Sequence, residues 1–159
     1  MKIYIASDHA GFELKRALIE HLRSKGFEVE DCGAHELDPD DDYPDYIFPL
    51  ATKVARGKPE DKGIVIGGSG QGEAMVANKV KGVRSALYYG GPSTSSGSDI
   101  IRLSKEHNDA NVLSLGARFL TVDDAKEAVD LWLSTKFSGE ERHVRRLGKI
   151  KKIEEKIYV

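Results

Sequence analysis

The sequence predicts an α/β fold: a three-layer α/β/α sandwich with a five-stranded parallel sheet and a C-terminal helix. Five short apolar runs alternate with stretches whose apolar residues recur at helical spacing. Short turns separate these segments, as is typical of a parallel sheet covered by helices on both faces. The chain has 159 residues, 40% of them hydrophobic, so we expect one domain over residues 1–159.

The first half of the chain begins this alternation. An apolar, β-rich run at residues 2–6 is broken by polar residues, and the amphipathic stretch that follows ends at Gly26, a residue type that often terminates helices. A long acidic loop comes next, and Pro44 suits the first turn of a helix after it. The predicted strands are residues 2–6 and 27–32, and the predicted helices are residues 12–25 and about 45–56.

The second half continues the same order of elements, which predicts a Rossmann-like sheet. A buried strand is followed by a glycine-rich turn and a helix, and residues 90–98 are rich in Gly, Ser and Pro, which indicates a loop. The predicted strands are residues 63–66, 83–89 and 111–115, and the predicted helices are residues 74–79, about 99–106, 121–134 and 140–156.

Composition excludes several classes of protein. The 24 basic and 26 acidic residues nearly cancel, which argues against a general nucleic-acid binder. No apolar run approaches the roughly 20 residues that span a membrane, and Met1 leads directly into a strand, so no signal peptide is expected. A single cysteine, Cys32, suits a reducing compartment. We therefore expect a soluble cytoplasmic protein with no nucleic-acid or membrane partner.

The glycine turn at residues 67–73, GGSGQGE, is the strongest functional signal. A turn between a strand and a helix gathers free backbone N–H groups, which favours an anion. Glu73 adds a carboxylate to the same turn, and this combination indicates proton chemistry on an anionic intermediate. The alternative is an ordinary turn whose Glu complements the helix dipole. A dinucleotide site fits less well, because Glu73 replaces the third glycine of that motif.

Polar residues also follow two other predicted strands. Asp8 and His9 follow the first strand, and Arg118 follows the fifth. Carboxyl ends of parallel strands share one edge of the sheet, where ligands bind in open α/β folds, so we expect these residues near the glycine turn. Each has a structural alternative: Asp8 as a helix cap, His9 as a surface residue, and Arg118 as an ion-pair partner.

Two further segments carry candidate residues. The last predicted helix holds a basic cluster in which Arg142 and Arg146 share a face, which suits either a bound anion or a solvated basic face. His107 ends a helix, where it can either move protons or complement the helix dipole. The histidines and Cys32 show no metal-ligand spacing, so no metal site is expected.

Several motifs together resemble the type B ribose-5-phosphate isomerase family, which includes galactose-6-phosphate isomerase subunits and allose-6-phosphate isomerases. The resemblance covers nearly the whole chain. It rests on SDHAGF at residues 7–12, DYP at 42–44, GGSGQGE at 67–73 with ANK at 77–79, EHNDANVL at 106–113 and RH at 142–143.

The sequence departs from the family pattern in two places. Many members have a catalytic Cys where this chain has Gly67. The chain is similar instead to the actinobacterial-type branch, in which the carboxylate matching Glu73 is taken as the base. Cys32 lies on the second predicted strand and is not expected to substitute. The loop at residues 90–98 is longer than is usual in the family and leaves the size of the sugar open.

The resemblance implies interconversion of ribose 5-phosphate and ribulose 5-phosphate through an enediolate, without metal or cofactor. Glu73 would be the base, kept ionised with the help of surrounding amides. Ser69 would exchange protons with the intermediate, and Asp8 and His107 would open the sugar ring. The family also implies a homodimer, with a tetramer as the alternative, whose neighbouring subunit supplies His107. The residues implied in binding substrate or phosphate are His9, Tyr43, Gly68, Gly70, Gln71, Gly72, Asn108, Arg118, Arg142 and Arg146.

Two alternatives stay open at this stage. One is isomerisation of a six-carbon sugar phosphate, such as allose 6-phosphate or galactose 6-phosphate. The other is a non-catalytic sugar-phosphate binding module on the same fold.

Overall fold

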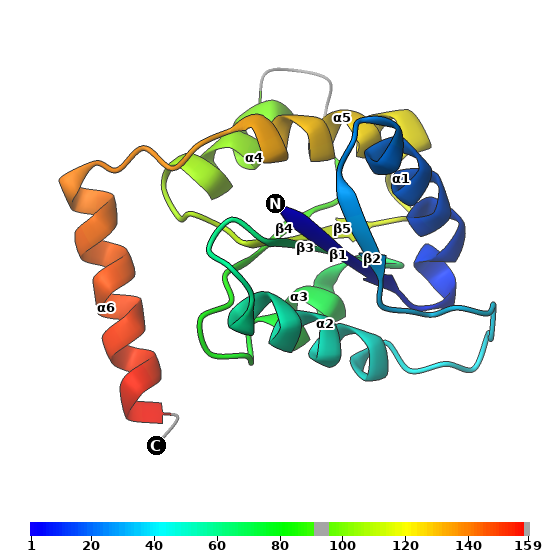
Figure 1. The fold of residues 1–159 in the computed structure, drawn as a ribbon, viewed down its shortest axis with the longest axis horizontal. Coiled ribbons are helices and arrows are strands. Elements are labelled where there is room, and N and C mark those ends of the chain that lie inside the picture. The colour runs from blue at the N-terminus through cyan, green and yellow to red at the C-terminus, as the bar shows by residue number, and fades with distance from the viewer. Residues whose placement is uncertain (91–95, 158–159) are drawn as a thin grey trace.

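The structure is a computed structural model that describes residues 1–90 and 96–157. Its five strands form one sheet in the order β2-β1-β3-β5-β4, and every neighbouring pair is parallel (Figure 1). This confirms the predicted five-stranded parallel sheet. The strands are β1 (Lys2–Ser7), β2 (Glu28–Asp31), β3 (Lys62–Gly67), β4 (Ser85–Tyr88) and β5 (Val112–Gly116).

Helices cover both faces of the sheet, as predicted. One layer contains α1, α4 and α5, and the opposite layer contains α2 and α3 (Figure 1). The helices are η1 (His9–Gly11, a single 3₁₀ turn), α1 (Phe12–Ser24), α2 (Pro44–Arg56), α3 (Gln71–Ala77), α4 (Ser96–Glu106), α5 (Val122–Ser134) and α6 (Glu141–Ile157). Thr121 caps α5 through a reciprocal pair of hydrogen bonds with Asp124, which explains why that helix begins where the sequence predicted.

The strands bury side chains on both faces, because alternate residues point to opposite layers. On β3, Ile64 and Ile66 join the core beneath α1, α4 and α5, whereas Val65 joins the core beneath α2. Both cores are closed to solvent, and Trp132 of α5 is fully buried in the larger one. The two cores hold the carboxyl ends of β1, β3 and β5 in fixed positions.

Several predicted boundaries need correction. The second and fourth strands are shorter than predicted, and the helix after the glycine turn begins at Gln71 rather than at residue 74. It starts early because Gly70 adopts a left-handed conformation, with φ of 75°, which turns the chain directly into the helix. Of the loop predicted at residues 90–98, residues 91–95 lie outside the described residues, and residues 96–98 belong to α4.

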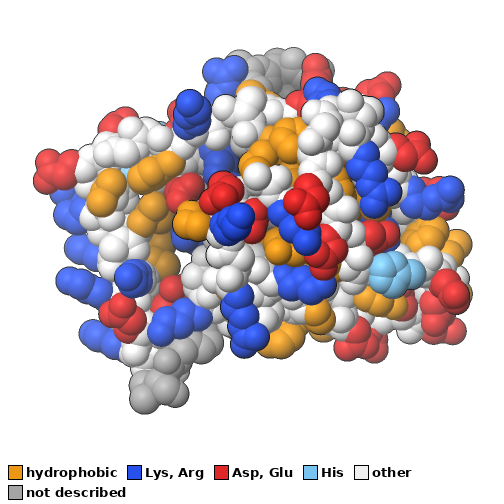
Figure 2. All heavy atoms as spheres, in the orientation of Figure 1, with side chains coloured by type: hydrophobic (Ala, Val, Ile, Leu, Met, Phe, Trp, Pro, Cys, Tyr) orange, Lys and Arg blue, Asp and Glu red, His pale blue; other side chains and the backbone are white. Residues whose placement is uncertain are grey.

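The C-terminal helix α6 stands apart from the sandwich (Figure 1). His143 is the one buried residue of this helix, while Val144, Ile150, Ile153 and Ile157 are 43 to 67% exposed. Figure 2 shows hydrophobic side chains gathered along α6 and flanked by Lys and Arg. The helix therefore offers an apolar face that its own chain leaves largely uncovered. In the described parts of the chain, no helix is long and apolar enough to cross a membrane.

Candidate active site

The predicted site residues that follow β1, β3 and β5 meet at one edge of the sheet. Strand register places Ser7 beside Ile66, and Gly67 beside Gly116, so the segments after all three strands emerge together. The backbone N–H of Arg118 donates to the carbonyl of Gly68 at 3.1 Å, and the Arg118 guanidinium lies against Gly68. The structure thus brings Arg118 onto the glycine turn.

The glycine turn is held tightly against its neighbours. Ser114 donates its hydroxyl to the Gly70 carbonyl at 2.6 Å from within the buried sheet. The ring of Tyr43, which enters from the start of α2, lies against Gly72. Ser69 is half-buried, and its Oγ accepts a long 3.4 Å hydrogen bond from the exposed Gln71. These contacts fix the turn that carries the predicted oxyanion-binding amides.

Glu73 lies in the first turn of α3 and is 4% exposed. Its carboxylate folds back against Gly67, so that a Cβ atom placed on Gly67 would overlap it. Burial raises the pKa of Glu73 above its ordinary value of 4.5, the residue's own backbone N–H partly offsets this, and the charge of Asp8 raises it further. The backbone amide therefore favours the ionised form, as expected, but desolvation outweighs it and the net direction of the pKa is upward.

Asp8 is buried directly after β1, and its Oδ1 accepts hydrogen bonds from the N–H groups of Ala10 at 3.0 Å and Gly11 at 3.2 Å. It therefore caps the 3₁₀ turn η1. Because Asp8 also raises the pKa of Glu73, the two carboxylates lie close enough to interact. Asp8 thus caps η1 and also interacts with Glu73. Its role as a cap is therefore compatible with a role in the site.

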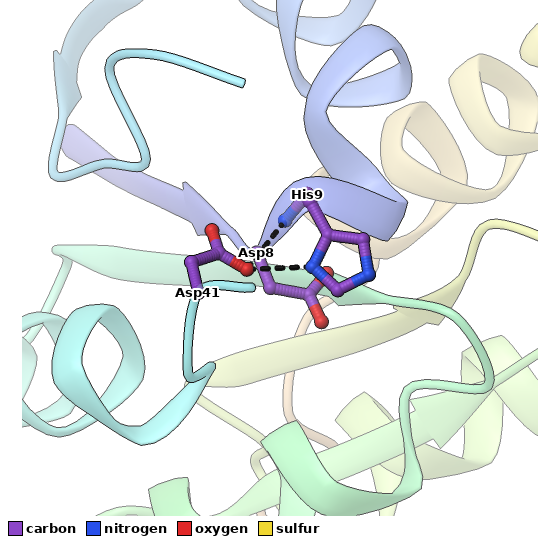
Figure 3. A group of neighbouring side chains, drawn as sticks. All are labelled: Asp8, His9 and Asp41. Atoms are coloured by element: carbon purple, nitrogen blue, oxygen red, sulfur yellow. Dashed lines mark hydrogen bonds and ion pairs between the residues drawn. The ribbon is translucent and has the colours of Figure 1, made fainter. Parts of the chain in front are cut away.

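His9 is paired with Asp41, a residue that sequence reasoning did not select. Asp41 Oδ1 accepts from the backbone N–H of His9 at 3.1 Å and lies 2.6 Å from His9 Nδ1 (Figure 3). The pKa of His9 is raised, chiefly by this hydrogen bond. The only available signal was the acidic run at residues 38–42, which does not distinguish Asp41 from its neighbours.

Asp8, His9 and Asp41 also form the one group, among the described residues, whose ligand atoms are spaced closely enough for a metal ion, within 4.8 Å of one another. Hydrogen bonds account for this spacing. Oδ1 of Asp8 is engaged by two backbone amides, and Oδ1 of Asp41 by the backbone and ring of His9. We therefore interpret the group as a helix cap beside a histidine–carboxylate pair.

His107 and Asn108 lie at the opposite edge of the sheet, because they precede β5 instead of following a strand. The ring of His107 lies 4.1 Å from that of His143, and His143 Nδ1 is 2.9 Å from Ser138 Oγ. Burial lowers the pKa of His143, and His107 lowers it further. The chain therefore does not bring His107 to its own glycine turn.

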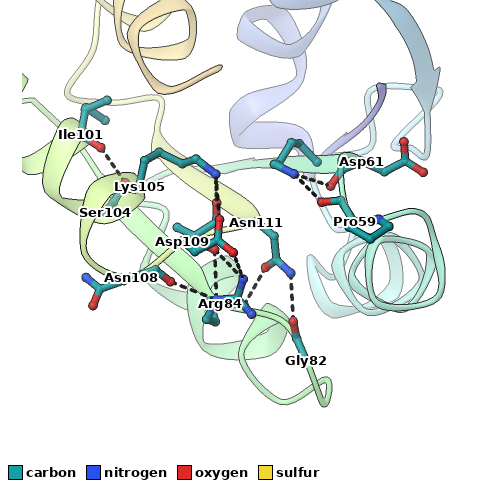
Figure 4. Close-up of polar contacts among 12 residues, drawn as sticks. Pro59, Asp61, Gly82, Arg84, Ile101, Ser104, Lys105, Asn108, Asp109 and Asn111 are labelled. Carbon is teal, nitrogen blue, oxygen red and sulfur yellow. Dashed lines mark hydrogen bonds and ion pairs between the residues drawn. The ribbon is translucent and has the colours of Figure 1, made fainter. Parts of the chain in front are cut away.

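The turn that carries Asn108 is held by Arg84. Its guanidinium donates to the carbonyls of Asn108 and Asp109 and forms an ion pair with the Asp109 carboxylate at 2.9 Å (Figure 4). Asn108 itself is exposed. Arg84 thus makes this turn rigid without linking it to Glu73.

Arg142 and Arg146 are exposed on α6, remote from the glycine turn (Figure 1). Arg142 Nε donates to Glu140 Oε2 at 2.8 Å. Within one chain, these two residues therefore lie on a solvated basic face. The structure unites Asp8, His9, Tyr43, Arg118 and Glu73 with the glycine turn, and it leaves His107, Asn108, Arg142 and Arg146 on the far side.

Comparison with known proteins identifies a matching family and related enzymes. The sequence model described as Ribose/Galactose Isomerase matches residues 3–150. The chain is 43% identical over 147 residues to ribose-5-phosphate isomerase B of Mycobacterium leprae, covering 92% of this chain and 86% of that protein. It is 44% identical over 148 residues to a probable ribose-5-phosphate isomerase B of Mycoplasma genitalium, covering 93% and 92%.

Solved structures show the same fold. Ribose-5-phosphate isomerase B of Clostridium thermocellum superposes with a TM-score of 0.88 at 44% identity, covering 98% of this chain and 99% of that one. The Mycoplasma genitalium enzyme with bound ribulose 5-phosphate superposes with a TM-score of 0.89 at 43% identity, covering 97% and 96%. With its site at the carboxyl edge of a matching sheet and sequence agreement along nearly its whole length, the chain belongs to the Ribose/Galactose Isomerase family.

Proposed function

We propose that this protein interconverts ribose 5-phosphate and ribulose 5-phosphate through an enediolate, with Glu73 as the base. One observation carries the proposal: the buried Glu73 carboxylate lies beneath a glycine turn, beside Asp8, at the ligand-binding edge of the sheet. The Mycoplasma genitalium enzyme was solved with bound ribulose 5-phosphate, which supports the choice of substrate.

The reaction requires a base and a group that stabilises negative charge. Glu73 removes the proton from C2 of the open-chain aldose and returns it to C1, while the hydroxyl proton moves between O2 and O1. A buried carboxylate with a raised pKa is a stronger base than an exposed one. The N–H groups of Gly68, Gly70, Gln71 and Gly72 stabilise the enediolate oxygens, and Ser69 exchanges protons with them.

The side chains beside the glycine turn are suited to bind the phosphate group of the sugar. The Arg118 guanidinium lies beside the turn, together with His9, whose pKa is raised, and Arg can contact a phosphate with two parallel hydrogen bonds. Tyr43 closes the side of the site nearest Gly72. Asp8 assists ring opening as one member of an acid–base pair. The proposed steps move only protons, so they need no metal or redox cofactor.

We further infer a homodimer, or a tetramer built from it, whose sites are shared between subunits. A second copy supplies the other acid–base residue, His107, together with Asn108, Arg142 and Arg146. The uncovered apolar face of α6 supports this assembly, since such faces mark interaction surfaces. A groove of about 430 Å³ beside that face has an apolar part that includes Val83, Ala86, Leu147, Ile150 and Ile153, and polar residues such as Arg84 and Glu154 also line it. We also infer a cytoplasmic location, in keeping with the single cysteine.

Turnover of a panel of sugar phosphates tests the proposal. Ribose 5-phosphate should be converted with the highest kcat/KM, ahead of allose 6-phosphate and galactose 6-phosphate. Preference for either six-carbon sugar would move the substrate assignment within the family. Binding of the sugars without turnover, and without exchange of the C2 proton with solvent, would instead identify a binding module and refute the isomerase assignment.

A further inference from the structure

The side chain of Asp41 is built into the site although it lies 32 residues away from its partner His9. Its side chain is 3% exposed, compared with 33% for His9. A buried carboxylate is costly unless it is paired and hydrogen-bonded. Among the described residues, Asp41 is paired through Oδ1 alone, which engages both the backbone N–H and the ring Nδ1 of His9, while its Oδ2 is buried without a hydrogen-bond partner. The pairing with His9 therefore compensates in part for the burial of the Asp41 carboxylate.

The loop itself turns Asp41 inward. The backbone N–H of Asp41 donates to the carbonyl of Asp38 at 3.2 Å, and that of Asp40 donates to the Asp38 carboxylate at 3.0 Å. This turn leaves Asp40 exposed and Asp41 facing His9. Two residues later the same loop places Tyr43 against Gly72. One segment thus positions two side chains of the site.

The pairing determines what the His9 ring can offer a ligand. An ionised carboxylate only accepts hydrogen bonds, so Nδ1 carries a proton. In the neutral ring Nε2 would then be an acceptor, which a dianionic phosphate ester cannot use because its oxygens only accept, whereas in the charged ring Nε2 is a donor. Figure 3 shows Nε2 pointing away from Asp41.

The charged groups facing His9 favour the donor form. Asp41 raises the pKa of His9 above its ordinary value of 6.5; burial opposes this, Asp8 raises the pKa again, and Arg118 lowers it. The net direction is upward. His9 therefore keeps its proton at higher pH than an isolated imidazole does.

We propose that Asp41 is a positioning residue of the site, which holds Nδ1 of His9 and thereby presents Nε2–H to the phosphate group of the sugar. This inference rests on the proposed function, because it assigns the ligand of His9 as a sugar phosphate. Asp41 does not touch the substrate. It acts through the orientation and the charge of the ring.

Asp41→Asn keeps the shape of the side chain and removes its charge, so it tests the inference. KM for ribose 5-phosphate should match the wild type near pH 6 and exceed it severalfold near pH 8, because loss of the Asp41 carboxylate lowers the pKa of His9 and the ring then loses its charge at a lower pH. We expect kcat to change less than twofold, because the reacting carbons are elsewhere. Asp40→Asn, the same change on the exposed neighbour, should leave KM unchanged.

A double-mutant cycle separates positioning from a general effect on folding. In His9→Asn, adding Asp41→Asn should cause no further rise in KM, because the positioned ring is absent. Additive losses in the cycle, or a rise in KM that is equal at every pH, would overturn the inference. Thermal unfolding of each variant shows whether a change in its kinetics comes from loss of the fold.

A measurement independent of turnover distinguishes this inference from the proposed function. Nitrogen NMR of the histidine rings, titrated with inorganic phosphate, should show His9 protonated to a higher pH and responding to phosphate more strongly in the wild type than in Asp41→Asn. Identical His9 titration and phosphate response in both proteins would refute the role of Asp41. A normal NMR result in a protein that fails to convert any sugar phosphate would support Asp41 and refute the isomerase assignment.

Discussion

The Glu73 carboxylate occupies the space that a side chain at position 67 would need. A Cβ atom on Gly67 would overlap the carboxyl group itself, so the buried Glu73 side chain would have to leave this position. This relationship gives a physical reason why Gly67 accompanies Glu73: a thiol at position 67 and a carboxylate from position 73 compete for one volume. A side chain at position 67 is thus incompatible with the carboxylate position that Glu73 adopts here.

Substitution of Gly67 should displace the base. We predict that Gly67→Ala lowers kcat by about 10²-fold, the scale of losing a general base, because the new methyl group pushes the Glu73 carboxylate out of position. Steady-state kinetics with ribose 5-phosphate measure the loss. In a Glu73→Gln background the same substitution should cost much less, and equal costs in both backgrounds would contradict the displacement.

Removal of the Glu73 carboxylate should abolish proton transfer but leave binding of the sugar phosphate largely intact. We predict that Glu73→Gln lowers kcat by about 10²-fold or more, whereas KM changes far less because the phosphate contacts lie elsewhere. Exchange of the substrate C2 proton with deuterated water should disappear together with turnover. The exposed Glu20 of α1 provides a control, and Glu20→Gln should behave as wild type. Near-normal exchange in Glu73→Gln would show that Glu73 only complements the helix dipole.

The pKa of Glu73 predicts the acid limb of the pH profile. A base is active when ionised, so kcat/KM should fall as the pH decreases through the pKa of Glu73 in the free enzyme. Because burial and Asp8 raise this pKa, the limb should lie above 4.5, the ordinary value for Glu. Asp8→Asn removes a neighbouring negative charge and should shift the limb to lower pH. A limb that stays in place would show that another group titrates there.

Mixing of two inactive variants should restore activity if the site is shared. Glu73→Gln and His107→Asn place their defects on opposite edges of the sheet. In a mixed dimer one site carries both defects and the other carries neither, so random mixing should recover about a quarter of wild-type activity. The variants must be unfolded and refolded together to allow exchange of subunits. Recovery no greater than the sum of the separate variants would place both residues in a site within one chain.

Cys32 should be dispensable. Its thiol is half-buried on the segment after β2, and burial raises its pKa, which keeps it in the unreactive thiol form. We predict that Cys32→Ser retains most of the activity and that a small alkylating reagent leaves the wild type working. Activity assays before and after alkylation, with mass spectrometry of the modified residue, provide the measurement. Strong inactivation through Cys32 would place the chemistry elsewhere.

The sequence by itself determined the order of elements, the parallel sheet and the edge at which the glycine turn lies. These features depend on local signals, namely apolar periodicity and the Asp8 cap, each of which acts over a few residues. The meeting of Arg118 with Gly68 also followed from the sequence, because the carboxyl ends of parallel strands necessarily share one edge.

The tertiary structure alone decided which acidic residue of the loop at residues 38–42 pairs with His9. Asp38, Asp40, Asp41 and Asp42 are chemically alike in the sequence, and only the turn of the folded loop directs Asp41 onto His9. It likewise decided the pKa of Glu73, because desolvation depends on packing from distant segments. The separation of His107 from the glycine turn is a property of the sheet, because His107 precedes β5, the turn follows the neighbouring parallel strand β3, and the length of the strands lies between them.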